Sequence, residues 1–576
     1  MKKVSVSVHD PGRVSRPGGP AERPRLWRMT GGRHRGVRYT LKMPWKREFL
    51  GFERPALVSA ADYLLSRYRR GARADLRNSI VVVPGGRAGR RLLEILVDRC
   101  SVEHLLLTPP HIETVGQLPE RLYRPKRPFA TELTQRLVWA QALRAAPAES
   151  IDRVVPRPPG HDEVLRWMEL GELVRRQHLE LAADGLDFSH VAQWAAAADG
   201  AADATRWQQL HHLQVDYLRR LDALEVWDIQ TARLVAVDKR ECATDHDLFL
   251  VGTADMNITL RRMLDQVASR VTSLVFAPEA WSDRFDGEGC LVAERWSSAV
   301  LPLSEGHVQL VEGPNEQAVA VRATLAGYEG RYAADDIVVG LADESLVPDV
   351  QRVLAEAGVA TRWGPGTPLE QSSPWQLLRA VANYLERPRF ADLAALLRHT
   401  DMSLWLQRRG VPGTYLCQLD DYYQDHLPYF LDTSSSSLGA EASVLARASG
   451  EVERVLRSLR QRPQPLTSWS APILQLLVDV YGDRDLDRTV DADRAVLAAC
   501  GAIRAALQEQ EQVPASVMPV VAAATALRWL LDSAGSETTP AHPVPAAVEL
   551  LGWLVLPLDV APALVITSFN EGHVPS

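Results

Sequence analysis

Residues 79–89 read Ser-Ile-Val-Val-Val-Pro-Gly-Gly-Arg-Ala-Gly, and this stretch indicates the fold class. The β-branched run Ile80–Val83 favours a strand, and the glycines that follow it favour a turn. Apolar residues then recur at helical spacing, as Leu92, Leu93, Leu96 and Val97. The stretch therefore predicts a short buried strand, a glycine-rich turn and an amphipathic helix.

Similar short apolar runs occur along the whole chain, and most of them precede a loop and a helical pattern. They are Leu248–Val251, Ser273–Phe276, His307–Val311, Asp336–Leu341 and Ala563–Thr567. Alternation of strands and helices is typical of α/β proteins with parallel sheets. We therefore expect an α/β fold.

Two long intervals lack such runs and show helical spacing instead. The residues that carry this spacing are Leu210, Leu213, Tyr217, Leu221 and Leu224 in the first interval, and Val452, Val455, Leu456, Leu459, Val496, Ala499, Cys500, Ile503 and Leu507 in the second. We expect two parallel-sheet domains, residues 43–305 with a helical insertion at about 130–240 and residues 306–576 with one at about 375–545.

The composition is that of a globular protein with a sizeable core: 576 residues, 46% of them hydrophobic, and five cysteines. The cysteines are odd in number and widely spaced, which predicts neither a disulfide framework nor a zinc motif. The longest apolar stretch, Val544 to Phe569, is interrupted by charged residues and prolines. No membrane-spanning segment is therefore expected.

Residues 1–42 differ in kind from the rest of the chain. They hold eleven Lys and Arg against two Asp and Glu, whereas the whole chain has a net charge of −7. Their Gly, Pro and Arg content without apolar periodicity predicts a disordered basic tail. Two interpretations remain open: a nucleic-acid-binding arm, or a misassigned start with translation from Met43.

The glycine turn has the geometry of a phosphate-binding loop without its usual side chains. A strand that ends in glycines before a helix presents backbone N–H groups to an anion. A nucleotide-hydrolysing loop also needs Lys for the phosphates and Ser or Thr for Mg²⁺, whereas Arg90, Arg91 and Leu92 follow Gly89 here. The turn is either a solvated basic turn or a site where these arginines meet an anion.

No catalytic residue is predicted. None of the six lysines follows a glycine or has an acid two positions before it, which excludes a Walker A motif and an Asp/Glu-x-Lys nuclease pair. The only acid shortly after the strand Leu248–Val251 is Asp255, a weak match to a magnesium-binding motif.

Two blocks of sequence resemble the AddB/RexB family, the second subunit of bacterial helicase-nucleases. At the C-terminus, Ala563–Thr567 leads into Ser568-Phe569-Asn570-Glu571-Gly572-His573-Val574-Pro575, which is similar to the family's Asn-Glu-Gly-x-x-Pro turn. At the N-terminus, residues 81–92 with 107–118 are similar to its degenerate first helicase motif and the Pro-x-Ile-x-Thr segment after it. The resemblance runs in order from about Met43 to Ser576.

The resemblance implies two superfamily-1-helicase-like domains, the second truncated because the sequence stops at Ser576. Family members pair with an AddA-like helicase-nuclease subunit and process broken DNA ends. They carry a C-terminal PD-(D/E)xK nuclease domain with an iron–sulfur cluster, and Mg is expected only of that part. This chain ends before it, so we expect a fragment without a working ATPase or nuclease motif, without a metal site and without a cofactor of its own.

By the same resemblance, the expected function is DNA binding and scaffolding in double-strand-break repair and recombination, in the cytoplasm at the nucleoid. The alternative is a nucleotide- or anion-binding α/β regulator unrelated to DNA. The degenerate phosphate-loop region is Gly85, Gly86, Arg87, Gly89, Arg90 and Arg91. The residues expected to contact DNA phosphates or to close the cleft between the domains are Arg87, Arg90, Arg91, Thr114, Gln117, Asn570 and His573. Asn570 and Glu571 are alternatively expected to cap the turn at Gly572.

Overall fold

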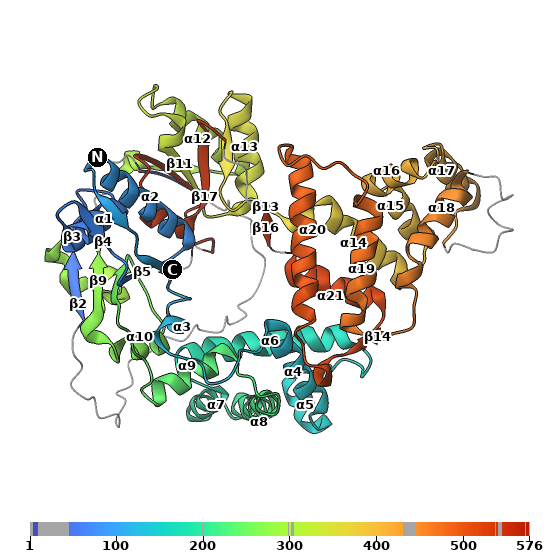
Figure 1. Ribbon diagram of the computed structural model, residues 1–576, viewed down its shortest axis with the longest axis horizontal. Coiled ribbons are helices and arrows are strands. Elements are labelled where there is room, and N and C mark those ends of the chain that lie inside the picture. The colour runs from blue at the N-terminus through green and yellow to red at the C-terminus, as the bar shows by residue number, and fades with distance from the viewer. Residues whose placement is uncertain are drawn as a thin grey trace, which may run out of the picture. The chain divides into compact units, whose positions relative to one another are not determined.

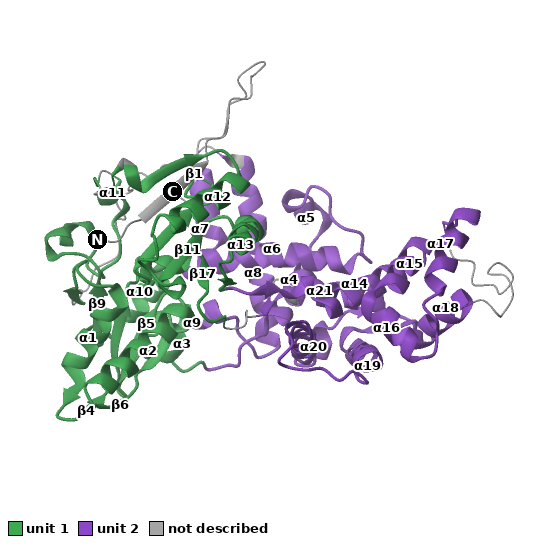
Figure 2. Ribbon diagram, turned by 90° about the horizontal axis from the view of Figure 1, so that it is seen from above, with its two compact units in different colours: residues 1–125, 233–364, 543–576 green, residues 126–232, 365–542 purple. Residues whose placement is uncertain are grey.

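The computed structural model describes residues 4–9, 45–198, 200–297, 299–300, 304–429, 444–535, 537–539, 544–570 and 572–574. The chain divides into two compact units, which are coloured separately in Figure 2. Unit 1 comprises residues 1–125, 233–364 and 543–576, and unit 2 comprises residues 126–232 and 365–542. Apart from strand β1, the region for which a disordered tail was expected lies outside the described residues.

Unit 1 contains a five-stranded parallel sheet. Its strands lie in the order β2 (Lys46–Phe49), β9 (Val271–Val275), β8 (Asp247–Val251), β5 (Ser79–Val83) and β7 (His111–Thr114). Helices α1 (Ala56–Tyr68) and α2 (Gly86–Val102) bury leucines against this sheet. The same unit holds α3 (Pro119–Leu122), α10 (Ile258–Asp265), α11 (Ala293–Trp296), and a small sheet of β3 (Arg69–Arg70), β4 (Arg73–Asp75) and β6 (Leu106–Thr108).

Unit 1 also contains a six-stranded parallel sheet. Its order is β10 (Val308–Val311), β1 (Val4–His9), β18 (Ala563–Thr567), β11 (Ile337–Leu341), β17 (Val548–Gly552) and β12 (Thr361–Trp363). Helices α12 (Pro314–Ala326) and α13 (Val347–Glu356) pack against its core. A 3-10 segment, η10 (Trp553–Leu558), follows β17. Both parallel sheets are visible in Figure 1.

Unit 2 is mainly helical. Its first segment folds into α4 (Glu132–Ala145), α5 (Ala148–Val154), α6 (Val164–Ala183), α7 (Phe188–Ala197) and α8 (Ala201–Ala223), and α9 (Ile229–Asp238) leads back into unit 1. Its second segment forms α14 (Ser373–Glu386), α15 (Phe390–Arg398), α16 (Thr400–Arg408), α17 (Tyr415–His426), α18 (Val444–Val455), α19 (Ser470–Tyr481), α20 (Asp491–Gln510) and α21 (Ala523–Ala534). One hydrophobic core draws residues from both segments, from Trp139 and Tyr217 to Trp405 and Trp469.

The mixed α/β class with parallel sheets is confirmed, and so are the five additional strands named from sequence. The expected helix is also present, but it begins at Gly86 rather than after Gly89, so Gly86 to Gly89 form its first turn and only Pro84 and Gly85 separate it from β5. Its buried face also differs from the expected one. Leu92 and Leu96 are fully buried, whereas Leu93 and Val97 are 37% and 47% exposed. The second helical interval, expected to lack strands, holds the short ladder of β14 (Gln464–Pro465) with β15 (Val520–Val521) and the strand β16 (Thr538–Thr539), which pairs with β13 (Thr367–Pro368).

Candidate functional site at the glycine turn

The glycine turn joins the carboxyl end of β5 to the start of α2. Gly85 is the N-cap residue with an extended backbone, and no side chain caps the helix. The first backbone N–H groups of a helix lack partners within the helix, so this end favours negative charge. A Cβ on Gly85 would meet nothing within 4 Å, whereas one on Gly89 would lie 2.8 Å from Ile112. Gly89 is therefore a packing residue, and the turn itself is open at Gly85.

Arg87 points toward two carboxylates that come from the other end of the chain. Its Nη1 and Nη2 donate to Glu549 Oε1 and Oε2 at 3.0 and 2.5 Å, and Nη2 also donates to Asp559 Oδ2 at 3.2 Å. Burial disfavours the charged guanidinium, but the hydrogen bonds and charge of Glu549 prevail and raise the pKa of Arg87. Arg362 lies 3.4 Å from Glu549 and adds a second positive charge.

The segment that carries Asp559 packs against both sheets of unit 1. Leu556 lies against β11, where a Cβ on Gly340 would stand 2.3 Å from Leu556 Cδ1. Leu558 lies against the end of β8, where a Cβ on Gly252 would stand 2.8 Å from Leu558 Cδ2. Because Gly340 and Gly252 have no side chains, the segment can sit this close to each sheet. This packing positions Asp559 beside Arg87.

Arg90 and Arg91 have surroundings unlike those of Arg87. Both are exposed on the first two turns of α2. Arg91 Nη1 lies 2.8 Å from Glu94 Oε2, a pair formed one turn along the helix. The structure gives Arg90 no partner among the described residues. Exposed pairs of this kind contribute little stability, so both guanidinium groups remain available to an anion from solution.

Thr114 and Gln117 lie next to the glycine turn. Thr114 stands beside Val83 in the register of β7 with β5. The backbone N and Oγ1 of Thr114 both donate to Gln117 Oε1, at 3.3 and 2.9 Å. The pair closes the loop after β7, and its side chains are at least partly exposed. The structure thus brings Thr114 and Gln117 to the same sheet edge as Gly85.

Asn570 and His573 follow β18 of the six-stranded sheet and contact residues of that part of unit 1. The backbone N of His573 donates to the Asn570 carbonyl at 3.2 Å, and His573 Nε2 lies 4.0 Å from Asp343 Oδ2. The turn is anchored by Ser568, whose backbone N and Oγ donate to Gln317 Oε1. Glu571, for which a capping role was considered, lies outside the described residues. These contacts place both residues in a turn after β18.

Within the described ranges, no group of three or more His, Cys, Asp or Glu side chains is positioned to hold a metal ion. In the same part of the chain, no helix combines the length and apolar character needed to cross a membrane. No protein-family model and no curated protein matches this sequence.

Reasoning from sequence missed the two residues that define the site, Glu549 and Asp559. Both were visible as isolated charges within the apolar stretch Val544 to Phe569. A charge at a strand position in such a stretch indicates that a partner of opposite sign is present. The identity of that partner, 462 residues away from Glu549, has no local signal.

Proposed function

We propose that this chain is a DNA-binding, scaffolding part of an AddB/RexB-like helicase-nuclease subunit, which holds a single strand without hydrolysing ATP. One observation carries the proposal. Arg87, at the glycine turn, donates hydrogen bonds to the carboxylates of Glu549 and Asp559. In contrast, Arg90 and Arg91 near the same helix end are exposed to solvent. The helicase-like identity of the two sheets rests on the sequence resemblance.

Nucleotide chemistry at the turn is disfavoured by two features. Leu92 follows the turn where a phosphate loop has Ser or Thr for magnesium, and its side chain is fully buried in the core of the sheet. The carboxylates of Glu549 and Asp559 lie on Arg87 and would repel a nucleotide phosphate there. Both features argue against the alternative of a nucleotide-binding regulator.

A phosphate backbone would instead meet the edge formed by α2 and β7. Arg90 and Arg91 supply charge, and Thr114 with Gln117 supply neutral hydrogen-bonding groups at the adjacent strand end. Contacts of both kinds to phosphates position a strand without reading its sequence. In the proposed assembly, an AddA-like subunit supplies the motor, and the complex processes broken duplex ends for recombinational repair.

The test is the salt dependence of binding to a fluorescein-labelled oligothymidine, measured by anisotropy. Each lost phosphate contact lowers the logarithmic slope by about 0.7 for single strands. Arg90→Ala/Arg91→Ala should therefore lower the slope by about 1.4, and Mg-ATP should leave binding unchanged. The matched control is Arg454→Ala, which removes an exposed arginine paired with Glu451 in unit 2.

An unchanged slope in the double variant would refute the assignment of these arginines. Stabilisation by Mg-ATP in a thermal melt, together with no binding to the oligonucleotide, would refute the proposed function and favour the nucleotide-binding regulator.

A further inference from the structure

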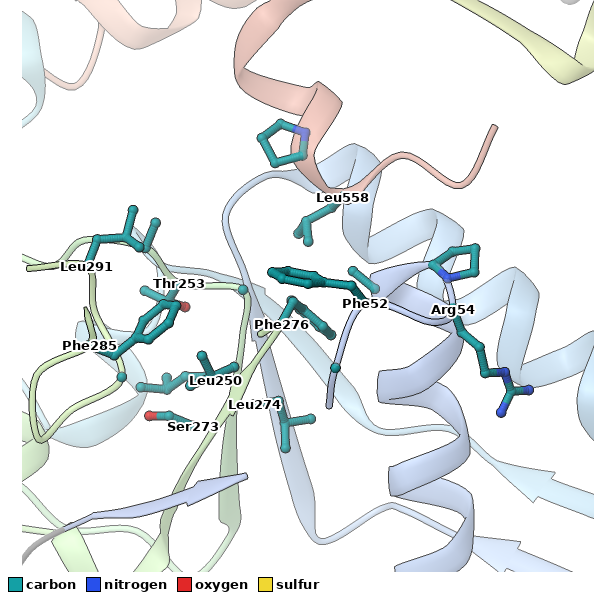
Figure 3. Close-up of a pocket in the computed structure, with 18 of the residues that line it drawn as sticks. Phe52, Arg54, Leu250, Thr253, Ser273, Leu274, Phe276, Phe285, Leu291 and Leu558 are labelled. Carbon is teal, nitrogen blue, oxygen red and sulfur yellow. The ribbon is translucent and has the colours of Figure 1, made fainter. Parts of the chain in front are cut away.

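A cavity of about 520 Å³ opens at the carboxyl ends of β2, β9 and β8 in unit 1. Its lining comes from the loops after these three strands, from residues 285–296, and from the end of η10. Figure 3 shows Phe52 and Phe276 beneath Leu558, with Leu291, Phe285 and Thr253 across the cavity from them. Pockets of this size commonly hold small organic ligands, and in open α/β sheets they occur at the carboxyl ends of the strands.

The walls of the cavity are mainly apolar and include four aromatic side chains. Phe52, Phe276, Phe285 and Trp296 all line it. The ring of Phe285 meets Trp296 edge to face with centroids 5.8 Å apart, and Phe52 meets Trp281 in the same way at 5.3 Å. Phe52 is 54% exposed, so a large part of its ring surface is unused by the fold. Such walls favour a flat ring that can stack or pack edge-on.

One buried polar group in the wall lacks a partner. Thr253 is only 8% exposed, and its Oγ1 is fully buried with no hydrogen-bond partner among the described residues. The other hydroxyl in the lining is already used, because Ser273 Oγ donates to the Glu288 carbonyl at 2.6 Å. Buried hydroxyl groups in native proteins are normally hydrogen-bonded. Thr253 lines the cavity, so a rotation of its side chain toward a bound ligand would give Oγ1 the partner that it lacks.

The charged residues of the lining do not call for a charged ligand. Asp559 is held by Arg87. Arg54 pairs with Asp62 at 2.7 Å, and its side chain extends away from Phe52 and Phe276 (Figure 3). Glu53 is exposed to solvent. A charged ligand would lose its hydration in an aromatic cavity without gaining a counter-charge. The ligand that fits is therefore uncharged.

We infer that this cavity binds an uncharged, planar heteroaromatic small molecule, whose ring packs against Phe52 and Phe276 and whose polar edge hydrogen-bonds to Thr253. The inference concerns a ligand site separate from Arg90 and Arg91, and it does not depend on the proposed DNA binding.

Two fluorinated probes of similar size test the inference on the full chain, with binding followed by broadening of the ligand's ¹⁹F signal. Fluoroindole has a ring N–H that can donate to Thr253, whereas fluoronaphthalene has none. We expect both to bind saturably. Thr253→Val should weaken fluoroindole about three- to tenfold, the range expected for one hydrogen bond, and should leave fluoronaphthalene unchanged.

Phe52→Ala is a second test, in which the altered side chain is not buried. Because Phe52 is half-exposed, its loss should preserve the fold, which a thermal melt checks, and should weaken both probes. The matched control is Thr414→Val, which changes an exposed threonine in unit 2 and should affect neither probe. The inference is overturned if neither probe binds saturably, if Thr253→Val weakens both equally, or if Phe52→Ala changes nothing.

Discussion

Arg87, in the first turn of α2, holds both carboxylate oxygens of Glu549, in the second position of β17. The bidentate geometry matches the planar guanidinium to the planar carboxylate and gives the strongest form of this pair. It joins the end of one parallel sheet to a strand of the other. Glu549 and Asp559 thus supply the negative charge that Arg87 and the helix N-terminus would otherwise attract from solution.

Removing Arg87 should destabilise unit 1. In Arg87→Ala, Glu549 and Asp559 stay partly buried without their shared partner, which should cost about 1–3 kcal/mol. Urea unfolding monitored by circular dichroism measures the change. Arg352→Ala, which removes an exposed helix pair with Glu356, should stay within about 0.5 kcal/mol. Equal effects of the two substitutions would contradict the structural role of Arg87.

Neutralising the two carboxylates should expose the anion-binding character of the turn. In Glu549→Gln/Asp559→Asn, Arg87 keeps its place beside the helix N-terminus but loses its negative partners. Pyrophosphate at roughly ten times its Kd for this variant should then stabilise the variant by about 1.4 kcal/mol and the unaltered chain by less. Adding Arg87→Ala to the variant should abolish the gain. Equal stabilisation of the unaltered chain by pyrophosphate would show that Glu549 and Asp559 do not keep anions from Arg87.

The packing of η10 on β11 depends on a glycine. In Gly340→Ala, the new methyl group would overlap Leu556, at a cost of about 1–3 kcal/mol. Combining it with Leu556→Ala should recover part of that loss, because residues in contact do not contribute additively. The control is Gly501→Ala on α20, where a Cβ meets nothing within 4 Å and should stabilise by about 0.5–1 kcal/mol. Full additivity of the first two substitutions would contradict the contact.

Protonation of His399 should make unit 2 less stable as the pH falls from 7 to 5. Burial lowers the pKa of His399, and its Nδ1 accepts a hydrogen bond from the backbone N of Asp401 at the start of α16. The imidazole of His399 therefore binds a proton more readily in the unfolded state. Its contribution to the stability of unit 2 is present above the pKa of His399 in the unfolded state and is lost as the pH falls below that value. In His399→Asn, which keeps an N-cap acceptor without a titrating group, unfolding free energy should depend less on pH over this range. An unchanged pH dependence would exclude the effect.

Three strands that no apolar run indicated in the sequence share a physical reason. β2, β7 and β12 are edge strands of their sheets, and their residues are mostly half-buried or exposed. Such strands need no continuous apolar run, so their sequences resemble loops. β17 lies inside its sheet, but the charged side chain of Glu549 interrupts its apolar pattern. The strand can hold this side chain because Arg87 neutralises its charge.

The sequence alone determined several local features: the strand at residues 79–83 with a turn and a helix after it, five further strands, and the helical character of both inserted segments. These features follow from periodicity and from backbone preferences, which neighbouring residues carry themselves. Only the tertiary structure decided that both inserted segments share one core, and that Arg87 faces Glu549 and Asp559 rather than solvent. Those contacts join residues hundreds of positions apart, and their energy depends on packing and burial that no local pattern records.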